Sequence, residues 1–332
     1  MKVLVIGGSH FVGRALVETA LRDGHEVTTL NRGRTGHDVN GAKLIRADRT
    51  NLDEFTEAVQ QGSWDAVIDT WSGAAVHATV AAKLLGPRTH HYGFVSSRSV
   101  YMWPIAIGSD ETHATVDGDP DDLSSDDYAK TKRGSELGVL AARPDALIAR
   151  AGTILGPYEN VGRLPWWILR VHRGGRVLAP GPAMRPLQYV DARDLARWMI
   201  ACGERLIGGV FNTVSAVGHT TIGQLLETVR EVTGSTAELV WFTPDEIESA
   251  AIEPWTELPI WVPPTGELAG LHDCDVTAAL RSGLQCRPIR ETITDTWNWL
   301  QHEGPPPQRV DRPPLGLDPQ REATLINSHD HP

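Results

Sequence analysis

The chain has 332 residues, 41% hydrophobic and 22% charged, so it has the composition of an ordinary globular protein and the length for two lobes around one large core. A net charge of −11 argues against nucleic acid as a partner, and no apolar run is long enough to span a membrane. Three cysteines without metal-ligand spacing, and no signal peptide before the first apolar run, predict a cytoplasmic protein with reduced thiols and no metal site.

The first thirteen residues predict a dinucleotide-binding turn. The run Lys2–Ile6 is typical of a parallel strand buried on both faces, and a glycine-rich turn follows it directly. Gly7 can take the positive φ of a tight turn, and Gly8 lets the backbone approach a pyrophosphate. Gly13 lets the next helix pack closely on the strand, with its N–H groups toward the anion. We therefore expect cofactor contacts from the whole turn: Gly7, Gly8, Ser9, His10, Phe11, Val12 and Gly13.

The end of the second predicted strand, Glu26–Leu30, is where dinucleotide enzymes select their cofactor. An acidic residue there would bind the ribose 2′-hydroxyl and repel a 2′-phosphate. This chain has Asn31, Arg32, Gly33 and Arg34 instead. Guanidinium groups without a carboxylate favour the phosphorylated cofactor, so we predict NADP(H). NAD(H) remains the alternative, because either arginine could be a solvated loop charge.

Two further strand–helix units follow. Strands are predicted over Lys43–Ala47 and Asp65–Asp69, and amphipathic helices over 52–60 and 76–85. Ligands bind beyond the carboxyl ends of parallel strands, so the residues ending the fourth strand are expected along the cofactor. These are Asp69, Thr70 and Trp71.

The fifth predicted strand, His91–Val95, leads into a serine-rich segment, and a later helix opens with Tyr128-x-x-x-Lys132. This spacing places the phenol and the ammonium on one helical face, one turn apart. An ammonium group and a positive nicotinamide ring both favour the phenolate, which suits an acid–base catalyst. The polar loop 110–127 has eight acidic residues and no Lys or Arg. It is interpreted as a solvated loop, with binding of a cationic substrate group as the alternative.

These motifs together resemble the short-chain dehydrogenase/reductase superfamily, specifically its extended, epimerase-like branch and the atypical groups close to it. Gly7 and Gly13 match the extended pattern Gly-x-x-Gly-x-x-Gly, while His10 stands where the middle glycine is usual. The resemblance implies that Tyr128 is the acid–base catalyst and that Lys132 holds the nicotinamide ribose.

Two further residues take roles from the same resemblance. Ser97, four residues before Tyr101, would hydrogen-bond the carbonyl oxygen, with Ser96 and Ser99 as alternatives. Asp48 matches the carboxylate that bonds the adenine, although an N-cap or turn role fits that residue equally well.

The resemblance also implies a doubly wound Rossmann sheet with a smaller C-terminal α+β lobe. The dinucleotide-binding domain is expected over 1–152 and 186–215, and the substrate-binding lobe over 153–185 and 216–303. Residues 304–332 are polar and rich in proline, so we expect a disordered tail.

Substrate contacts are harder to predict. Ser99, Tyr101 and Trp166 are candidates, although a core position is the alternative for the tryptophan. Relatives that act on nucleotide-sugars often hold the diphosphate with an arginine where this chain has Leu187, and Arg185 lies two residues away. Arg98-Ser99 replaces the Asp-Glu pair of the family's dehydratases, which argues against sugar dehydration.

The sequence therefore predicts an oxidoreductase that transfers hydride between nicotinamide and a carbonyl or carbinol carbon of a small molecule, with carbonyl reduction preferred. One alternative is a sugar or nucleotide-sugar epimerase that retains NAD. Another is a non-catalytic dinucleotide-sensing or RNA-binding module. Members of the superfamily often form homodimers, but the sequence does not decide the oligomeric state.

Overall fold

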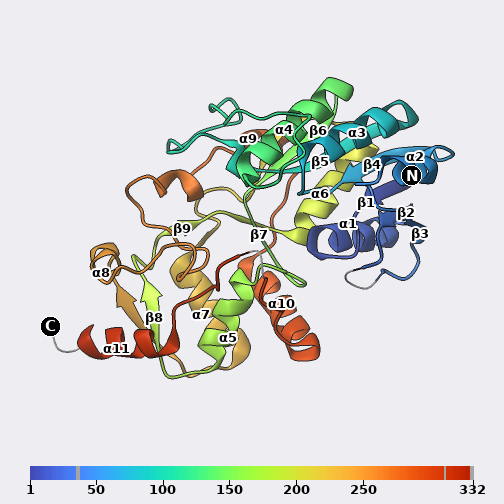
Figure 1. The fold of residues 1–332 in the computed structure, drawn as a ribbon. Coiled ribbons are helices and arrows are strands. Elements are labelled where there is room, and N and C mark those ends of the chain that lie inside the picture. Colours follow the sequence, from blue (N-terminus) through green and yellow to red (C-terminus); the bar gives the residue numbers. More distant parts are fainter. Residues whose placement is uncertain (35–37, 310–311, 330–332) are drawn as a thin grey trace.

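The larger lobe is built on one parallel sheet. The computed structural model describes residues 1–34, 38–309 and 312–329 (Figure 1). Seven strands lie in the order β11-β6-β5-β4-β1-β2-β3, and all neighbouring pairs are parallel. They are β1 (Lys2–Ile6), β2 (Glu26–Asn31), β3 (Lys43–Arg46), β4 (Trp64–Asp69), β5 (Thr89–Ser97), β6 (Leu147–Ala151) and β11 (Gly209–Thr213).

Helices cover both faces of this sheet because the strands are apolar on both. Val3 and Val5 of β1 pack in the core beneath α1 (Phe11–Arg22) and α6 (Ala192–Glu204). Leu4 and Ile6 belong to the core on the opposite face, formed with α2 (Leu52–Val59), α3 (Ala75–Leu85) and α4 (Tyr128–Ala142). This two-sided burial explains the continuous apolar runs and confirms the predicted doubly wound fold.

The smaller lobe packs helices and short strand pairs around a second core that contains the fully buried Trp167 and Trp261. Its strands are β8 (Arg176–Pro180) with β13 (Glu238–Phe242), and β9 (Pro186–Leu187) with β12 (Thr220–Thr221), while β7 (Thr153–Leu155) pairs with β10 (Tyr189–Asp191) where the chain passes between lobes. Its helices include α5 (Arg163–His172), α7 (Ile222–Thr233), α8 (Pro244–Ser249) and α10 (Ile289–Glu303), and α9 (Thr277–Arg281) lies beside β11.

The prediction of a disordered tail is wrong for its last helical part. Residues 319–329 form α11 (Pro319–His329), which packs beside β8 at the end of the smaller lobe (Figure 1). The carboxylate of Glu322 is buried, accepts from Nε of Arg170 at 2.6 Å and accepts from the amide of Leu178 at 3.1 Å. A buried ion pair and an apolar helix face outweigh the polar, proline-rich composition. Residues 310–311 and 330–332 of the predicted tail lie outside the described residues.

Among the described residues, no helix has the length and apolarity needed to cross a bilayer. In the same part of the chain, no group of three or more His, Cys, Asp or Glu side chains is placed to hold a metal ion.

Candidate active site

The glycine turn has the geometry that a pyrophosphate requires. Gly7 and Gly8 have φ of 114° and 102°, conformations that favour glycine. A Cβ on Gly13 would lie 2.5 Å from the amide nitrogen of Gly8, so the first turn of α1 can approach β1 only without a side chain there. The cradle thus fits a dinucleotide as the sequence predicts.

We expect Gly13→Ala to weaken NADPH binding by about tenfold or more, because the new methyl group must push the turn away from the pyrophosphate. Calorimetric titration checks this, with Gly203→Ala as the control because Gly203 is helical and a Cβ there would meet its nearest atom, Cβ of Ala66, at 3.4 Å. Equal affinity in wild type and Gly13→Ala would contradict this account of the turn.

A cleft of about 250 Å³ opens where the strand order reverses between β1 and β4. It is lined by Ile6, Gly7, Gly8, Ser9, His10, Leu30, Asn31, Arg32, Gly33, Ala47, Arg49, Thr70, Trp71 and Ser72. Most of the predicted cofactor residues therefore meet in one place. The side chain of Val12 is instead buried in the core under α1, and Phe11 faces a separate groove beside α10.

The end of β2 is positively charged, as the sequence predicts. The guanidinium groups of Arg32 and Arg34 lie 3.9 Å from the Oδ2 atom of Asp48, and their side chains are 46% and 69% exposed. Asp48 accepts from the amide and the hydroxyl of Thr50. Those hydrogen bonds, with the two arginines, hold the pKa of Asp48 below its usual range. Asp48 therefore acts as the turn residue that the sequence left open, and it does not line the cleft.

Asp69 does not line the cleft either, which corrects the prediction. Its fully buried carboxylate forms a bidentate ion pair with Arg49, at 2.6 and 2.8 Å, and accepts from the Tyr92 hydroxyl at 3.2 Å. The Arg49 guanidinium lies 4.6 Å from the Trp71 ring centroid and lines the cleft itself. Sequence reasoning missed Arg49, although an acid at the end of a buried strand requires a cationic partner.

Tyr128 is the first residue of α4, and its hydrogen-bond partner Ser97 is the last residue of β5. Asp127 caps α4 by accepting from the amide of Lys130 at 3.1 Å, which places Tyr128 in the first turn. The phenol shares a hydrogen bond with Ser97, whose Oγ also lies 3.1 Å from Oγ of Ser99. Although 41% of Tyr128 is exposed, desolvation raises the pKa of its phenol, against the Ser97 hydrogen bond and nearby arginines. The phenol is therefore protonated at neutral pH.

Lys132 lies one turn along α4 and is buried. Its Nζ donates to the carbonyl oxygen of Val95 at 2.7 Å and to that of Trp71, which joins the ends of β5 and β4 beside the cleft. Burial lowers the pKa of this ammonium to about 8. The cations that lower the phenol pKa include Arg163, Arg309 and Arg312, a role that the sequence assigned to Lys132.

The model of the NAD dependent epimerase/dehydratase family matches residues 3–213, which include the glycine turn, Ser97, Tyr128 and Lys132. The chain belongs to this family. It is therefore an NAD(P)-dependent enzyme of the short-chain dehydrogenase/reductase type, as the resemblance implied.

Individual relatives of this family are distant. A UDP-glucose 4-epimerase from Corynebacterium glutamicum is 25% identical over 276 residues, covering 70% of this chain and 81% of the relative. The chloroplast stem-loop binding protein of 41 kDa b from Arabidopsis thaliana is 22% identical over 264 residues, covering 74% and 67%. The solved structure of WbmH from Bordetella bronchiseptica in complex with NAD+ shares the fold, with a TM-score of 0.69, 17% identity, and coverage of 91% and 99%.

Three of the four predicted substrate residues of this epimerase-family chain are committed to contacts inside the protein, which corrects those predictions. Tyr101 is buried and donates to Oδ1 of Asn212 at 2.7 Å. Arg185 is buried and donates to the carbonyl oxygens of Val262, Pro263 and Ala269. Trp166 packs beneath Gly316, where a Cβ would lie 1.7 Å from its Nε1.

Ser96 and Ser99, the two alternatives for the catalytic serine, have different environments. The Oγ atom of Ser99 lies 3.1 Å from that of Ser97. Ser96, the other alternative for the catalytic serine, is buried and donates to Glu136 at 2.7 Å, so its hydroxyl is committed to the core.

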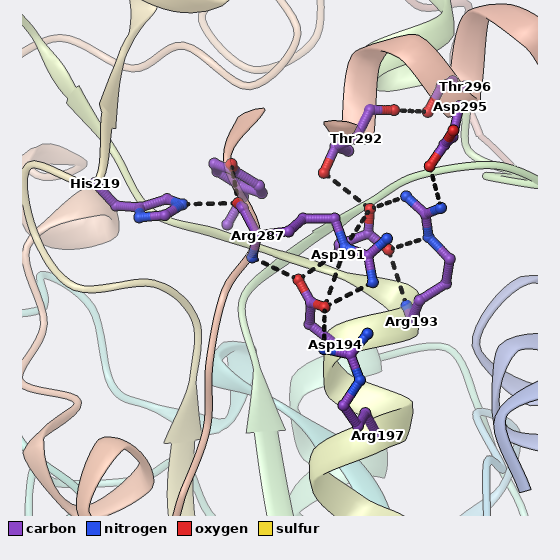
Figure 2. A network of polar contacts seen from close by, with 10 residues as sticks. Asp191, Arg193, Asp194, Arg197, His219, Arg287, Thr292, Asp295 and Thr296 are labelled. Atoms are coloured by element: carbon purple, nitrogen blue, oxygen red, sulfur yellow. Dashed lines mark hydrogen bonds and ion pairs between the residues drawn. The ribbon is translucent and has the colours of Figure 1, made fainter. Parts of the chain in front are cut away.

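A polar network fixes the two lobes of this family fold against each other (Figure 2). Asp191, at the N-terminus of α6, accepts from Arg193 at 2.7 Å and from Thr292 of α10 at 2.8 Å. Burial favours a higher pKa for Asp191, but Arg193 and Arg287 hold it below the usual value. Arg287 also donates to Asp194 at 2.7 Å, and Arg193 pairs with Asp295. Residues 191–194, where the chain returns to the larger lobe, are therefore bonded to residues 287–295 of the smaller lobe.

Proposed function

We propose that the protein uses NADPH to reduce a carbonyl group of a small molecule. The observation that carries this proposal is the protonated phenol of Tyr128, with Ser97 as its hydrogen-bond partner, one helical turn from Lys132. Lys132 donates to the carbonyl oxygen of Trp71, which lines the dinucleotide cleft. Reduction needs a proton donor at the carbonyl oxygen, and a phenol with a raised pKa holds its proton until that oxygen becomes basic.

Each polar group has one role in this reaction. Ser97 donates a hydrogen bond to the carbonyl oxygen, and Tyr128 transfers its proton to that oxygen as the alcohol forms. Lys132 binds the nicotinamide ribose after exchanging one of its carbonyl partners for a ribose hydroxyl. When bound, the reduced nicotinamide supplies the hydride to the carbonyl carbon. The oxygen gains one proton and the carbon gains one hydride, which balances the reduction.

The positive end of β2 supports NADP(H) as the cofactor. We expect the Arg32→Ala/Arg34→Ala variant to bind NADPH about tenfold to a hundredfold more weakly, because a charge-assisted hydrogen bond contributes about 1.5–3 kcal/mol. Its affinity for NADH should not change. Calorimetric titration of both cofactors checks this, with Arg22→Ala, at the far end of α1, as the control. A parallel loss for both cofactors would mean that the arginines are structural.

Epimerisation with a retained NAD is the second candidate, and the Corynebacterium relative favours it. Two observations favour reduction. Leu187 stands where nucleotide-sugar enzymes have an arginine, and Arg185 is committed to backbone carbonyls of its own lobe. Analysis of the purified protein for bound cofactor separates the candidates. An epimerase retains NAD through purification, whereas a reductase releases its cofactor and oxidises added NADPH in proportion to the product formed.

A further inference from the structure

Three residues on one face of α4 are bonded to three consecutive residues at the end of β5. Those on α4 follow one another at intervals of one helical turn. The pairs are Tyr128 with Ser97, Lys132 with the carbonyl oxygen of Val95 at 2.7 Å, and Glu136 with the Ser96 hydroxyl at 2.7 Å. The tyrosine, the lysine and Ser97 have roles in the proposed reaction, whereas Glu136 and Ser96 have none.

The carboxylate of Glu136 is fully buried, and its two oxygens accept four hydrogen bonds. Besides Ser96, the donors are Nε and Nη2 of Arg150 at 2.9 and 2.8 Å, and Nη1 of Arg133 at 3.0 Å. Arg150 is itself buried and belongs to β6. A bidentate pair of this kind has a strict geometry. Glu136 therefore ties α4 to β5 and β6 at once.

Arg150 extends the same contact to the loop that leads into α4, residues 102–127. Its Nη1 donates to the carbonyl oxygen of Glu111 at 3.1 Å, and its guanidinium lies 4.9 Å from the ring centroid of Tyr101. The carboxylate of Glu111 accepts from the amide of Asn212, in β11, at 2.7 Å. The loop is therefore anchored to β6 and β11 before it reaches the start of α4.

Glu136 also acts on Lys132 through its charge. Burial lowers the pKa of Lys132 to about 8, with a smaller contribution from Arg49, while the carboxylates of Asp69 and Glu136 raise it. Removal of the charge of Glu136 therefore shifts the deprotonation of Lys132 to lower pH. A contact that served only to stabilise the fold would not have this effect.

We propose that Glu136 is a positioning residue of the active site, which holds the end of β5 against α4 through Ser96 and Arg150. It does not line the cofactor cleft. The serine and the phenol of the proposed reduction thereby keep one arrangement around the substrate carbonyl. This inference rests on the proposed function, because it names a residue on which the geometry of that reaction depends.

The test uses Glu136→Gln and Ser96→Ala. The second variant keeps both arginine contacts of Glu136. Glu322→Gln is the matched control, because Glu322 is likewise buried and accepts from Nε of Arg170 at 2.6 Å, but it lies in the smaller lobe. The double variant Glu136→Gln/Arg150→Gln is measured as well, since it leaves no unpaired guanidinium in β6 if the single variant fails to fold.

The first measurement is amide hydrogen exchange of residues 95–97 in the free protein. The amides of β1 are the reference, because β1 pairs with β2 and β4 and not with β5. We expect exchange at 95–97 to rise about tenfold relative to β1 in both site variants, since a hydrogen bond that involves a charged group is lost or weakened there. In Glu322→Gln both segments should change in parallel. A parallel change in Ser96→Ala and Glu136→Gln would overturn the inference.

The second measurement is the affinity for NADPH, by calorimetry, as a function of pH. In the wild type the affinity should fall as the pH rises through about 8, because the Lys132 ammonium loses the proton that it donates to the ribose. The fall should occur at lower pH in Glu136→Gln and in the double variant, and at the wild-type pH in Ser96→Ala and Glu322→Gln. A wild-type pH profile in Glu136→Gln would leave that residue a structural role alone.

The two measurements separate this inference from the proposed function. If the wild type does not bind NADPH, or binds it equally at every pH, the proposed role of Lys132 fails, and exchange at residues 95–97 still decides the inference. If NADPH binding depends on pH as expected but local exchange does not rise in Ser96→Ala, only the inference fails.

Discussion

Replacement of Tyr128 by Phe is expected to reduce the rate of the proposed NADPH-dependent carbonyl reduction by about 10²–10⁴-fold, the usual contribution of a positioned general acid. The substitution removes the hydroxyl that Ser97 contacts and keeps the ring that starts α4. Affinity for NADPH should remain within about twofold of wild type, because the cleft is lined by other residues. Absorbance of NADPH follows the rate, and calorimetry follows the binding.

Tyr158→Phe is the matched control for this variant. Tyr158 also lies between the lobes, but its ring stacks on Arg14 in the groove beside α10, away from the cleft. Loss of the Tyr158 hydroxyl should leave the rate unchanged. A wild-type rate in Tyr128→Phe would exclude the phenol as the proton donor, and loss of NADPH binding in that variant would point to a structural role.

Substitution of Arg49 by Met is expected to lower the free energy of unfolding by about 3–5 kcal/mol, because it leaves an uncompensated buried charge. The carboxylate of Asp69 is 0% exposed and receives two hydrogen bonds from Arg49. The same change removes a cation that stacks on Trp71 at the cleft. Urea denaturation measures the loss, and NADPH affinity should fall in the same variant.

Arg290→Met is the control, since Arg290 is 57% exposed and its ion pair should contribute at most about 1 kcal/mol. The double variant Arg49→Met/Asp69→Asn should recover part of the stability, because it no longer buries an unpaired charge. A single-variant loss no greater than that of Arg290→Met would show that the pair is not structurally important.

The cofactor lobe was predictable from local sequence because its determinants are local. The strand, the glycine turn and the opening of α1 lie within thirteen residues, and the crowding at Gly13 follows from chain geometry. Tyr128 and Lys132 are likewise one helical turn apart. Their roles near the cofactor came from the family resemblance, while their hydrogen-bond partners required the three-dimensional structure.

The smaller lobe was less predictable because its contacts join distant parts of the chain. The pair of Arg170 and Glu322 spans 152 residues, so nothing in the composition of residues 304–332 indicated a packed helix. From the sequence, Arg185 is a candidate for binding an anion. In the structure it is buried and donates to carbonyl oxygens that lie 77 to 84 residues away along the chain.

Binding of a nicotinamide dinucleotide in the cleft is the central claim, and energy transfer from Trp71 to the reduced nicotinamide ring tests it most directly. Trp71 lines the cleft, and its indole donates to the carbonyl oxygen of Ala74 at 2.8 Å, which fixes its orientation. Titration with NADPH should quench tryptophan emission and produce sensitised nicotinamide emission. Trp71→Phe should lose much of that signal while calorimetry still detects binding. Absence of saturable binding for both NADPH and NADH would contradict the account.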